Sequence, residues 1–268
     1  MLHFLDKNAP FPAADFPKGA VLLVDKPLGW TSFDVVNKLR WNLCKRLGVK
    51  RLKVGHAGTL DPLASGLLIL CVGDHTKRID EFQAMPKEYT GTFTFGATTP
   101  SFDLEKPVDA TFPTAHLTPE LLEEKRHRFL GEIQQIPPMF SAVKVDGKRL
   151  YRNARTGEEV ELEPRTVQIH EFEIGPLRPV SVAAGRDKPL QLNAKPPHIM
   201  LHPDYPDGLQ ADFRVACGKG TYIRSLAHDL GEALGSGAYL SALRRTRTGG
   251  FSVENAASVA DWVAWISG

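Results

Sequence analysis

The chain has 268 residues, of which 42% are apolar, so it is long enough to bury the core of one large domain or two small ones. Its 33 Lys and Arg residues barely exceed its 31 Asp and Glu residues, so the overall charge does not require a polyanionic partner, and any nucleic-acid surface must come from local basic clusters. Three cysteines without CxxC spacing argue against a disulfide framework or a thiolate metal site, and no apolar run could span a membrane, so we expect a cytoplasmic globular protein.

The first predicted elements are a buried strand and an amphipathic helix. Residues 20–25 form a short apolar run that indicates the strand, and a Lys-Pro-Leu-Gly turn follows it. Thr31 or Ser32 can cap the helix, which we expect to run to about Leu47 with Gly48 as its stop.

The middle of the chain predicts a strand, a helix and a hairpin. The segment YTGTFTFG alternates with period two, which indicates a half-buried strand with Tyr89 and two phenylalanines on one face and threonines on the other. In TPELLEEKRHRFLG, Thr118 is the expected N-cap, Pro119 the first helical residue and Gly131 the stop. Asp146-Gly147 marks the tip of the hairpin.

The last third of the chain begins with a segment rich in proline. Seven prolines between residues 176 and 206 leave little room for regular hydrogen bonding, so we expect an irregular surface insertion at about 177–208. A strand, a Gly-rich turn and a helix capped by Thr221 follow, and the helix directs five apolar residues inward: Ile223, Leu226, Ala227, Leu230 and Leu234. Because strands and helices mix without regular alternation, we predict an α+β fold.

Asp61 is the first candidate for chemistry. It lies in KVGHAGTLDPLASGLLILCVG, where glycines shape a turn and Pro62 pushes the aspartate toward extended geometry. Such a residue is either a structural Asx turn or a catalytic carboxylate, and the residues alone leave both open. His56 stands five residues upstream, and a lone histidine of this kind is more often a satisfied loop or core residue than a functional one.

A second candidate is the segment CGKGTYIRS, in which a Gly-rich turn opens a helix. It lacks the G-x-x-x-x-G-K-[ST] spacing, which excludes a phosphate-binding loop of the NTPase type. Tyr222 and Arg224 could orient a carboxylate or a phosphate at the helix N-terminus, or could equally be a core tyrosine and a surface arginine. The chain has no G-x-S-x-G elbow for a serine hydrolase and no HExxH or acidic metal motif.

Considered together, these segments resemble the bacterial tRNA pseudouridine-55 synthase family. The resemblance is strongest in GHAGTLDPLASGLL and continues in the same order through LLVDKPLGWTS, KEYTGTFTFG, IPPMFSAVKVDGKRLY, GKGTYIR and LRRTRTGGF. It implies an α+β fold with a mixed, largely antiparallel sheet flanked by helices and a central active-site cleft. It also implies that a uridine in the tRNA T-loop is isomerised to its C-glycoside without a cofactor or a metal.

The resemblance assigns roles to individual residues. Asp61 matches the essential carboxylate, acting as nucleophile or base, Arg224 matches the arginine that pairs with it, and Tyr89 matches the ring that stacks on the flipped uracil. His56 matches a histidine that enters the T-loop. The remaining matches are a pocket tyrosine, an apolar wall, a lysine packed near the site, and a pair that supports the catalytic loop: Tyr222, Leu243, Lys77 and Lys26-Pro27.

The resemblance also gives the basic clusters a use. The segments 45–53, 144–155 and 244–247 can neutralise phosphates along the tRNA T-arm and elbow, and Arg244 and Arg245 are the substrate-binding candidates of the last segment. We expect a monomer with one catalytic domain over residues 1–268, without the family's usual small C-terminal RNA-binding domain. The alternative is a catalytically inactive tRNA-binding or tRNA-folding module, which would not need Asp61, Tyr89 and Arg224 together.

Overall fold

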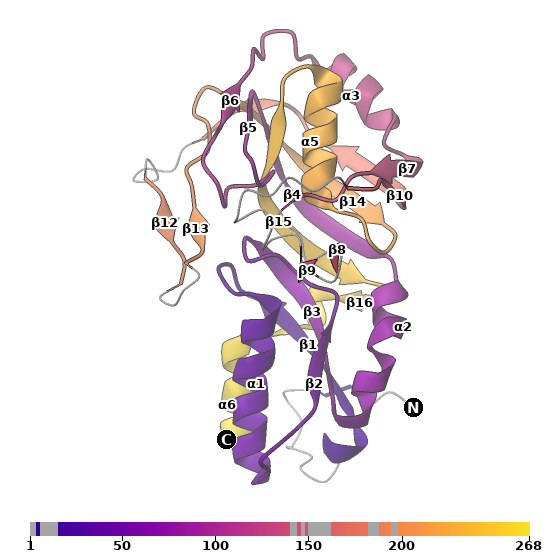
Figure 1. Cartoon of the computed structure of the whole chain (residues 1–268), viewed down its shortest axis with the longest axis vertical. Coiled ribbons are helices and arrows are strands. Elements are labelled where there is room, and N and C mark those ends of the chain that lie inside the picture. The colour runs from indigo at the N-terminus through magenta and orange to yellow at the C-terminus, as the bar shows by residue number, and fades with distance from the viewer. Residues whose placement is uncertain are drawn as a thin grey trace. The chain divides into compact units, whose positions relative to one another are not determined.

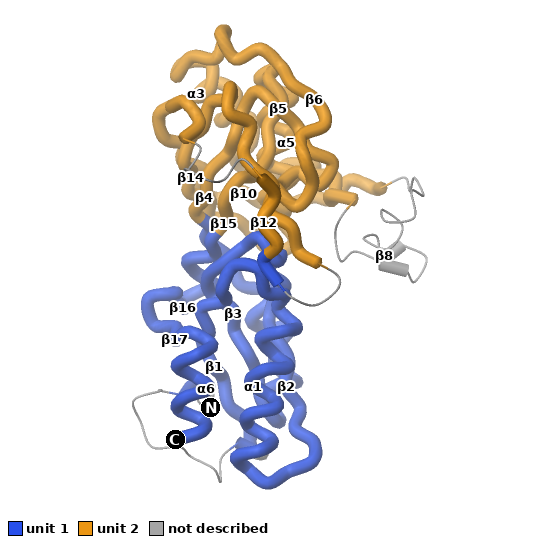
Figure 2. The backbone as a smooth tube through the Cα atoms, turned by 90° about the vertical axis from the view of Figure 1, so that its left-hand side faces the viewer, with its two compact units in different colours: residues 1–89, 192–197, 244–268 blue, residues 90–191, 198–243 orange. Residues whose placement is uncertain are grey.

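The chain folds into two compact units, each built on β-strands. The computed structural model describes residues 4–5, 16–139, 144–145, 148–149, 162–181, 188–193 and 198–268. Unit 1 contains Met1–Tyr89, Leu192–Pro197 and Arg244–Gly268, and unit 2 contains Thr90–Gln191 and His198–Leu243, as the two colours of Figure 2 show. No helix in the described part of the chain is long and apolar enough to cross a bilayer.

The sheet of unit 1 is mixed and largely antiparallel. Its strands are β1 (Ala20–Lys26), β2 (Val54–Ala57), β3 (Ala64–Val72), β4 (Lys87–Phe95), β15 (Ala238–Thr248), β16 (Phe251–Ser252) and β17 (Ala257–Ser258). The order is β17-β1-β3-β15-β4, with β2 on β3 and β16 on β15 (Figure 1). β17 joins β1 in parallel, whereas β1 and β2 run antiparallel to β3. β4 and β15 continue into unit 2.

Helices cover both faces of the β1 and β3 strands in unit 1. The helices are α1 (Ser32–Leu47), α2 (Ile79–Ala84) and α6 (Val259–Ser267), with short 3-10 turns η1 (Phe16–Lys18), η2 (Gly73–Arg78) and η3 (Val253–Asn255). Leu22 and Val24 pack with α1 and α6 on one face, and Val21 packs with Phe82 of α2 on the other. Because β3 is buried on both faces, its sequence is a continuous apolar run.

Unit 2 has a sheet of order β15-β4-β14-β10-β7. Its further strands and helices are β5 (Ala97–Thr98), β6 (Ala110–Thr111), α3 (Pro119–His127), β7 (Gly131–Gln135), β8 (Lys144–Val145), β9 (Lys148–Arg149), β10 (Arg165–Ile174), β11 (Arg178–Pro179), β12 (Leu190–Gln191), β13 (Met200–Leu201), β14 (Leu209–Cys217) and α5 (Ile223–Leu234). Phe93 stacks on Phe213 at 4.0 Å between ring centroids, which joins β4 to β14 in the core.

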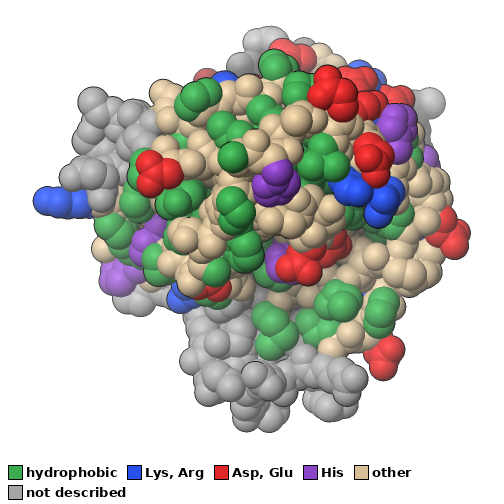
Figure 3. Space-filling view, turned by 90° about the horizontal axis from the view of Figure 1, so that it is seen from above, with side chains coloured by type: hydrophobic (Ala, Val, Ile, Leu, Met, Phe, Trp, Pro, Cys, Tyr) green, Lys and Arg blue, Asp and Glu red, His purple; other side chains and the backbone are tan. Residues whose placement is uncertain are grey.

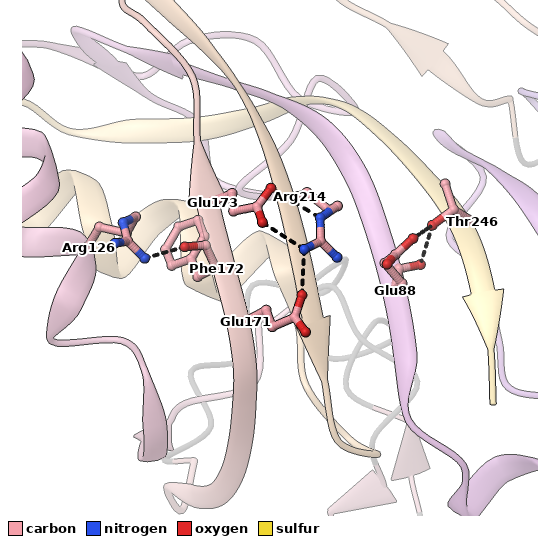
Figure 4. A network of polar contacts seen from close by, with 7 residues as sticks. All are labelled: Glu88, Arg126, Glu171, Phe172, Glu173, Arg214 and Thr246. Carbon is pink, nitrogen blue, oxygen red and sulfur yellow. Dashed lines mark hydrogen bonds and ion pairs between the residues drawn. The ribbon is translucent and has the colours of Figure 1, made fainter. Parts of the chain in front are cut away.

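Charged side chains also join the strands of unit 2. Figure 4 shows Arg214 of β14 between Glu171 and Glu173 of β10, with 2.7 Å from its Nη2 to Glu173 Oε1. Arg126 of α3 donates to the backbone carbonyl of Phe172. Since these carboxylates are exposed to solvent, the pairs set the alignment of β10 and β14 more than they stabilise the fold.

Most predicted elements are confirmed, and two helix ends differ. Thr31 caps α1 through the amide of Asp34, and Gly48 ends it at φ 67°. The five inward residues of α5 are buried, but Tyr222 is its N-cap, and Thr221 instead donates its hydroxyl to Gly218 O at 3.1 Å. Similarly, Gly131 was the expected stop of α3, but the helix already ends at His127, because the chain turns there before β7 begins.

Three other predictions need refinement. Thr94 is 0% exposed, so β4 is buried on both faces near its end rather than half-buried. The proline-rich segment is not wholly irregular, since β11 pairs with β14 and β12 with β13 in its described parts. β8 and β9 pair as the arms of the predicted hairpin, whose tip, Asp146-Gly147, lies outside the described residues.

Candidate active site

Asp61 lies in the loop that connects β2 to β3, residues 58–63, which we call the Asp61 loop. The loop begins at Gly58, whose φ of 92° is a conformation that favours glycine, and a main-chain hydrogen bond of 3.0 Å from Ala64 N to Asp61 O closes its turn. Asp61 is partly exposed, whereas Leu60 and Leu63 on either side of it are buried. The apolar neighbours therefore anchor the loop while the carboxylate stays accessible.

The first turn of α1 holds the Asp61 loop in place. The Ser32 hydroxyl accepts a hydrogen bond from Leu60 N at 2.9 Å and donates one to Leu60 O at 3.1 Å. In addition, Gly29 N donates to Pro62 O at 2.9 Å. The sequence offered Ser32 only as an alternative helix cap, so its contact with the loop, 28 residues away, was missed.

Lys26 supports the turn from which Gly29 reaches the loop. Its side chain is 0% exposed, and Nζ donates to Trp30 O at 2.6 Å and Pro27 O at 3.0 Å. Burial is the main reason that the pKa of Lys26 falls to about 8, and the Asp61 carboxylate is the leading influence that raises it. Lys26 thus places a buried ammonium group within the electrostatic reach of Asp61.

Arg245 connects the start of the Asp61 loop to β3, the strand that follows it. It is 1% exposed, and its guanidinium donates from Nη2 to Gly58 O at 3.1 Å and from Nε to Leu67 O at 2.7 Å. Its main chain also lies against Gly66, where an added Cβ would come within 2.3 Å of Arg245 O. The expectation that Arg245 binds RNA phosphate is therefore wrong for a direct contact, because its guanidinium is buried against backbone carbonyls.

Arg244 differs from its neighbour although the two residues are adjacent in β15. Successive side chains of a strand point to opposite faces, and Arg244 remains partly exposed. It makes two hydrogen bonds to the Asp25 carboxylate, at 2.7 and 3.0 Å, and approaches Ser65 Oγ at 3.4 Å. Asp25 was not among the predicted residues, and the sequence contains no signal that singles it out.

His56 lies near the end of β2, two residues before the Asp61 loop begins, and is half-buried. Its Nδ1 atom is buried and has no hydrogen-bond partner among the described residues. Burial, and then the positive charge of Arg245, lower the pKa of His56 below its usual value of 6.5, so the imidazole is neutral at pH 7. A neutral ring with an unsatisfied nitrogen can accept or donate one further hydrogen bond, depending on its tautomer.

Tyr89 lies in β4 at the end of unit 1 and is 9% exposed. The preceding residue, Glu88, is fixed by Thr246 of β15, whose hydroxyl donates to Glu88 Oε1 at 2.7 Å (Figure 4). Lys77, in contrast, is not packed near a site as expected. Its side chain is 72% exposed and pairs with Asp74 Oδ1 at 2.8 Å, because η2 turns it toward solvent.

Two of the candidates in unit 2, Arg224 and Tyr222, lie at the start of α5. Arg224 is 4% exposed, donates to Ser101 O at 3.1 Å, and has its Nε 3.7 Å from Asp103 Oδ2. Tyr222 exchanges two backbone hydrogen bonds with the side-chain amide of buried Gln135, at 2.8 and 3.0 Å. Leu243 of β15 is partly buried. Asp103 and Gln135 were missed because nothing in the sequence pairs them with a helix more than 80 residues away.

Comparison with known proteins identifies the family to which these residues point. The model of the TruB family pseudouridylate synthase (N terminal domain) matches residues 45–185, and that of the tRNA pseudouridylate synthase B C-terminal domain matches residues 224–266. The chain is 52% identical to tRNA pseudouridine synthase B of Phocaeicola vulgatus over 94% of this chain and 95% of the relative. It is 51% identical to the protein of the same name from Bacteroides thetaiotaomicron, with the same coverage.

Solved structures show a similar fold. A Cbf5-Nop10-Gar1 complex contains a chain that is 28% identical, with a TM-score of 0.58, over 95% of this chain and 56% of that chain. An H/ACA RNP bound to a substrate RNA containing 2′-deoxyuridine contains one that is 25% identical, with a TM-score of 0.57, over 97% of this chain and 59% of that chain. The present chain therefore spans less than two thirds of these solved chains.

Proposed function

This chain belongs to the TruB family of pseudouridylate synthases, and on that premise we propose that Asp61 is the essential carboxylate with which it isomerises a T-loop uridine of tRNA, at position 55, to pseudouridine. In this reaction the bond from ribose C1′ to uracil N1 breaks, the ring turns, and a bond forms from C1′ to C5. The C5 proton is then lost and N1 gains one, so the reaction needs no redox step. A carboxylate can act here as nucleophile or as base.

The observation that carries this proposal is the fixation of the Asp61 loop. Backbone groups of the loop are bound by three separate elements: α1 through Ser32, the turn that precedes α1 through Gly29, and β15 through Arg245. A carboxylate that reacts with one atom of a flipped nucleotide must be held within a fraction of an ångström. An aspartate that only shaped a turn would not need this support from three sides.

The residues around the loop follow from the same proposal. Lys26 and Arg245 act as positioning residues, since each donates to backbone carbonyls. The half-buried His56, which lies two residues before the loop begins, contacts the RNA next to the flipped base. Tyr89 stacks on the flipped uracil, as aromatic rings do in enzymes that extrude a base.

The family resemblance also assigns roles to residues of unit 2. By the family resemblance, Arg224 is assigned as the arginine that pairs with the catalytic carboxylate, and Asp103 and Ser101 orient its guanidinium. Tyr222 and Leu243 form the polar and apolar sides of the uracil pocket. We further propose that the enzyme acts as a cytoplasmic monomer without a metal. None of these observations favours the inactive tRNA-binding module, because binding alone does not need a positioned carboxylate.

Replacement of Asp61 by Asn tests the proposal. The variant should fold and bind tRNA, because the main-chain hydrogen bond that closes the turn remains, but it should form no pseudouridine in an unmodified tRNA transcript. Chemical mapping of pseudouridine gives both the extent of reaction and the uridine chosen. The matched control is Asp109→Asn, an exposed aspartate in unit 2 that should keep wild-type turnover. Turnover of Asp61→Asn within about tenfold of wild type, or ~1.4 kcal/mol in the barrier, would refute the assignment.

A further inference from the structure

Unit 1 contains an open cavity of about 900 Å³ that the proposed chemistry does not use. It lies where the C-terminal half of α1, the segment that follows it and the start of β2 meet η2 and α2. Its polar lining is basic, with Arg40 from α1 and Lys50, Arg51 and Lys53 from the segment before β2, and Cys44 lies among them. We call this feature the basic cavity.

The cations of the basic cavity are not neutralised by the protein. Within the described part of the chain, no carboxylate lies within ion-pair distance of Lys50, Arg51 or Lys53, and the hydrogen bond of Arg40 goes to the neutral Asn37 side chain at 2.7 Å. The pKa of Asp74 is lowered mainly by its hydrogen bond to Lys77, and the charge of Lys53 makes only a smaller contribution to this shift. Concentrated positive charge without a partner attracts anions.

The structure divides one basic run of the sequence into two parts. Lys45 and Arg46 belong to the same run as Lys50 and Arg51, but they do not line the cavity. The ammonium group of Lys45 lies over the Trp41 ring, 5.5 Å from its centroid. The two pairs carry the same charge, so they allow a comparison in which only the position of the charge differs.

The basic cavity is connected by the chain to the Asp61 loop. Lys53 to Gly55 line the cavity and lead into β2, and the end of β2 opens into the loop. The eight residues from Lys53 to Asp61 can span at most about 26–29 Å when fully extended. Phosphates along one strand of a duplex are spaced by roughly 3 Å along its axis, so this distance corresponds to on the order of ten base pairs or fewer.

We propose that the basic cavity binds backbone phosphates of the substrate RNA at a point several nucleotides from the uridine that is isomerised. Leu52, Val54 and Ile79 also line the cavity, but it is open, and its four cations match a run of phosphates rather than an apolar ligand or a single anion. Elsewhere on the molecule, the face drawn in Figure 3 shows prominent acidic side chains and few basic ones, so it does not offer an equivalent site. The identity of the RNA as tRNA rests on the proposed function.

The first test compares two doubly substituted variants, Lys50→Gln with Arg51→Gln and Lys45→Gln with Arg46→Gln. The dissociation constant for tRNA is measured over a range of salt concentrations after circular dichroism has shown that both variants are folded. The cavity variant should reduce the slope of log affinity against log salt by roughly 1.4–1.8, because each lost phosphate contact contributes ~0.7–0.9. The control should stay near the wild-type slope. Equal slopes for all three proteins, or a fall in the control alone, would overturn the proposal.

The second test uses Cys44 as a reporter inside the cavity. It is partly exposed, whereas Cys71 and Cys217 are 0% and 1% exposed and burial raises the pKa of Cys71 to about 11. Iodoacetamide should therefore label Cys44 first. Saturating tRNA should slow this labelling in the wild-type protein, and the ratio of rates with and without tRNA should approach one in the cavity variant. An unchanged wild-type labelling rate at saturating tRNA would refute the proposal.

Pseudouridine formation, measured separately, distinguishes this inference from the proposed function. If the wild type forms no pseudouridine but the slope and the Cys44 protection change as expected, the phosphate site stands and the proposed reaction fails. If pseudouridine forms but neither binding measurement changes, the reaction stands and the phosphate site fails.

Discussion

Lys26→Met tests whether unit 1 buries a positive charge beside the Asp61 loop. Lys26 is 0% exposed, and its pKa falls from 10.5 to about 8, mainly because of burial. Below pH 8 the side chain is protonated in both the folded and the unfolded states, and burying the charge costs about 3 kcal/mol at ~1.4 kcal/mol per pKa unit. Between pH 8 and 10.5 the unfolded chain binds the proton more strongly, so the contribution of Lys26 to folding becomes more favourable as the pH rises.

The measurement is the free energy of unfolding in urea, followed by tryptophan fluorescence between pH 7 and 10.5. Lys26→Met also loses the hydrogen bonds to Pro27 O and Trp30 O, so its unfolding free energy differs from that of the wild type at every pH. The effect of the charge is the change of this difference with pH. This difference should shift by about 3 kcal/mol in favour of the wild type across the interval. Lys38→Met, on the exposed side of α1, is the control and should follow the wild-type curve. Parallel curves for Lys26→Met and wild type would refute the reasoning.

Three further substitutions test the contacts around the Asp61 loop. Ser32→Ala leaves the buried N–H and C=O of Leu60 without their partner, so we expect a loss of about 1–3 kcal/mol in unfolding free energy and slower single-turnover isomerisation. An unchanged rate would show that the two hydrogen bonds of Ser32 do not position the loop. Arg245→Met removes two buried hydrogen bonds and should destabilise the protein by several kcal/mol, at ~1.5–3 kcal/mol for each. Arg244→Met breaks a partly exposed pair with Asp25 and should cost about 1 kcal/mol or less, and equal losses in urea unfolding would contradict the structure.

Local signals in the sequence were sufficient to predict the elements that have clear capping or stop residues or a clear apolar spacing. The Thr31 cap and Gly48 stop define α1, and the apolar spacing of α5 gives its buried face correctly. Each of these depends on residues within one or two turns of one another. The misplaced cap of α5 has the same origin, since Thr221 is a good capping residue by type, but the backbone places Tyr222 at that position.

The contacts that build the candidate site could not be predicted, because they join residues far apart in the chain. Ser32 meets Leu60 across 28 residues, and Arg245 meets Leu67 across 178. The sequence gives Arg244 and Arg245 the same chemistry, and only the alternation of β15 decides which one is buried. Lys77 shows a different error. The family resemblance predicted a lysine packed near the site, but η2 turns its side chain toward solvent.

The buried charges of unit 1 are better explained by their role in positioning the Asp61 loop than by a contribution to the stability of the fold. Replacing buried charged groups with apolar ones is often neutral or stabilising, so Lys26 and Arg245 would be poor choices if unit 1 needed only a core. Both donate hydrogen bonds to backbone carbonyls in or beside the segments that hold the Asp61 loop. An apolar core could fill the same volume but could not fix the direction of those carbonyls. The cost of burying these cations therefore accompanies a loop whose geometry is specified by directional bonds, which is what a reacting carboxylate requires.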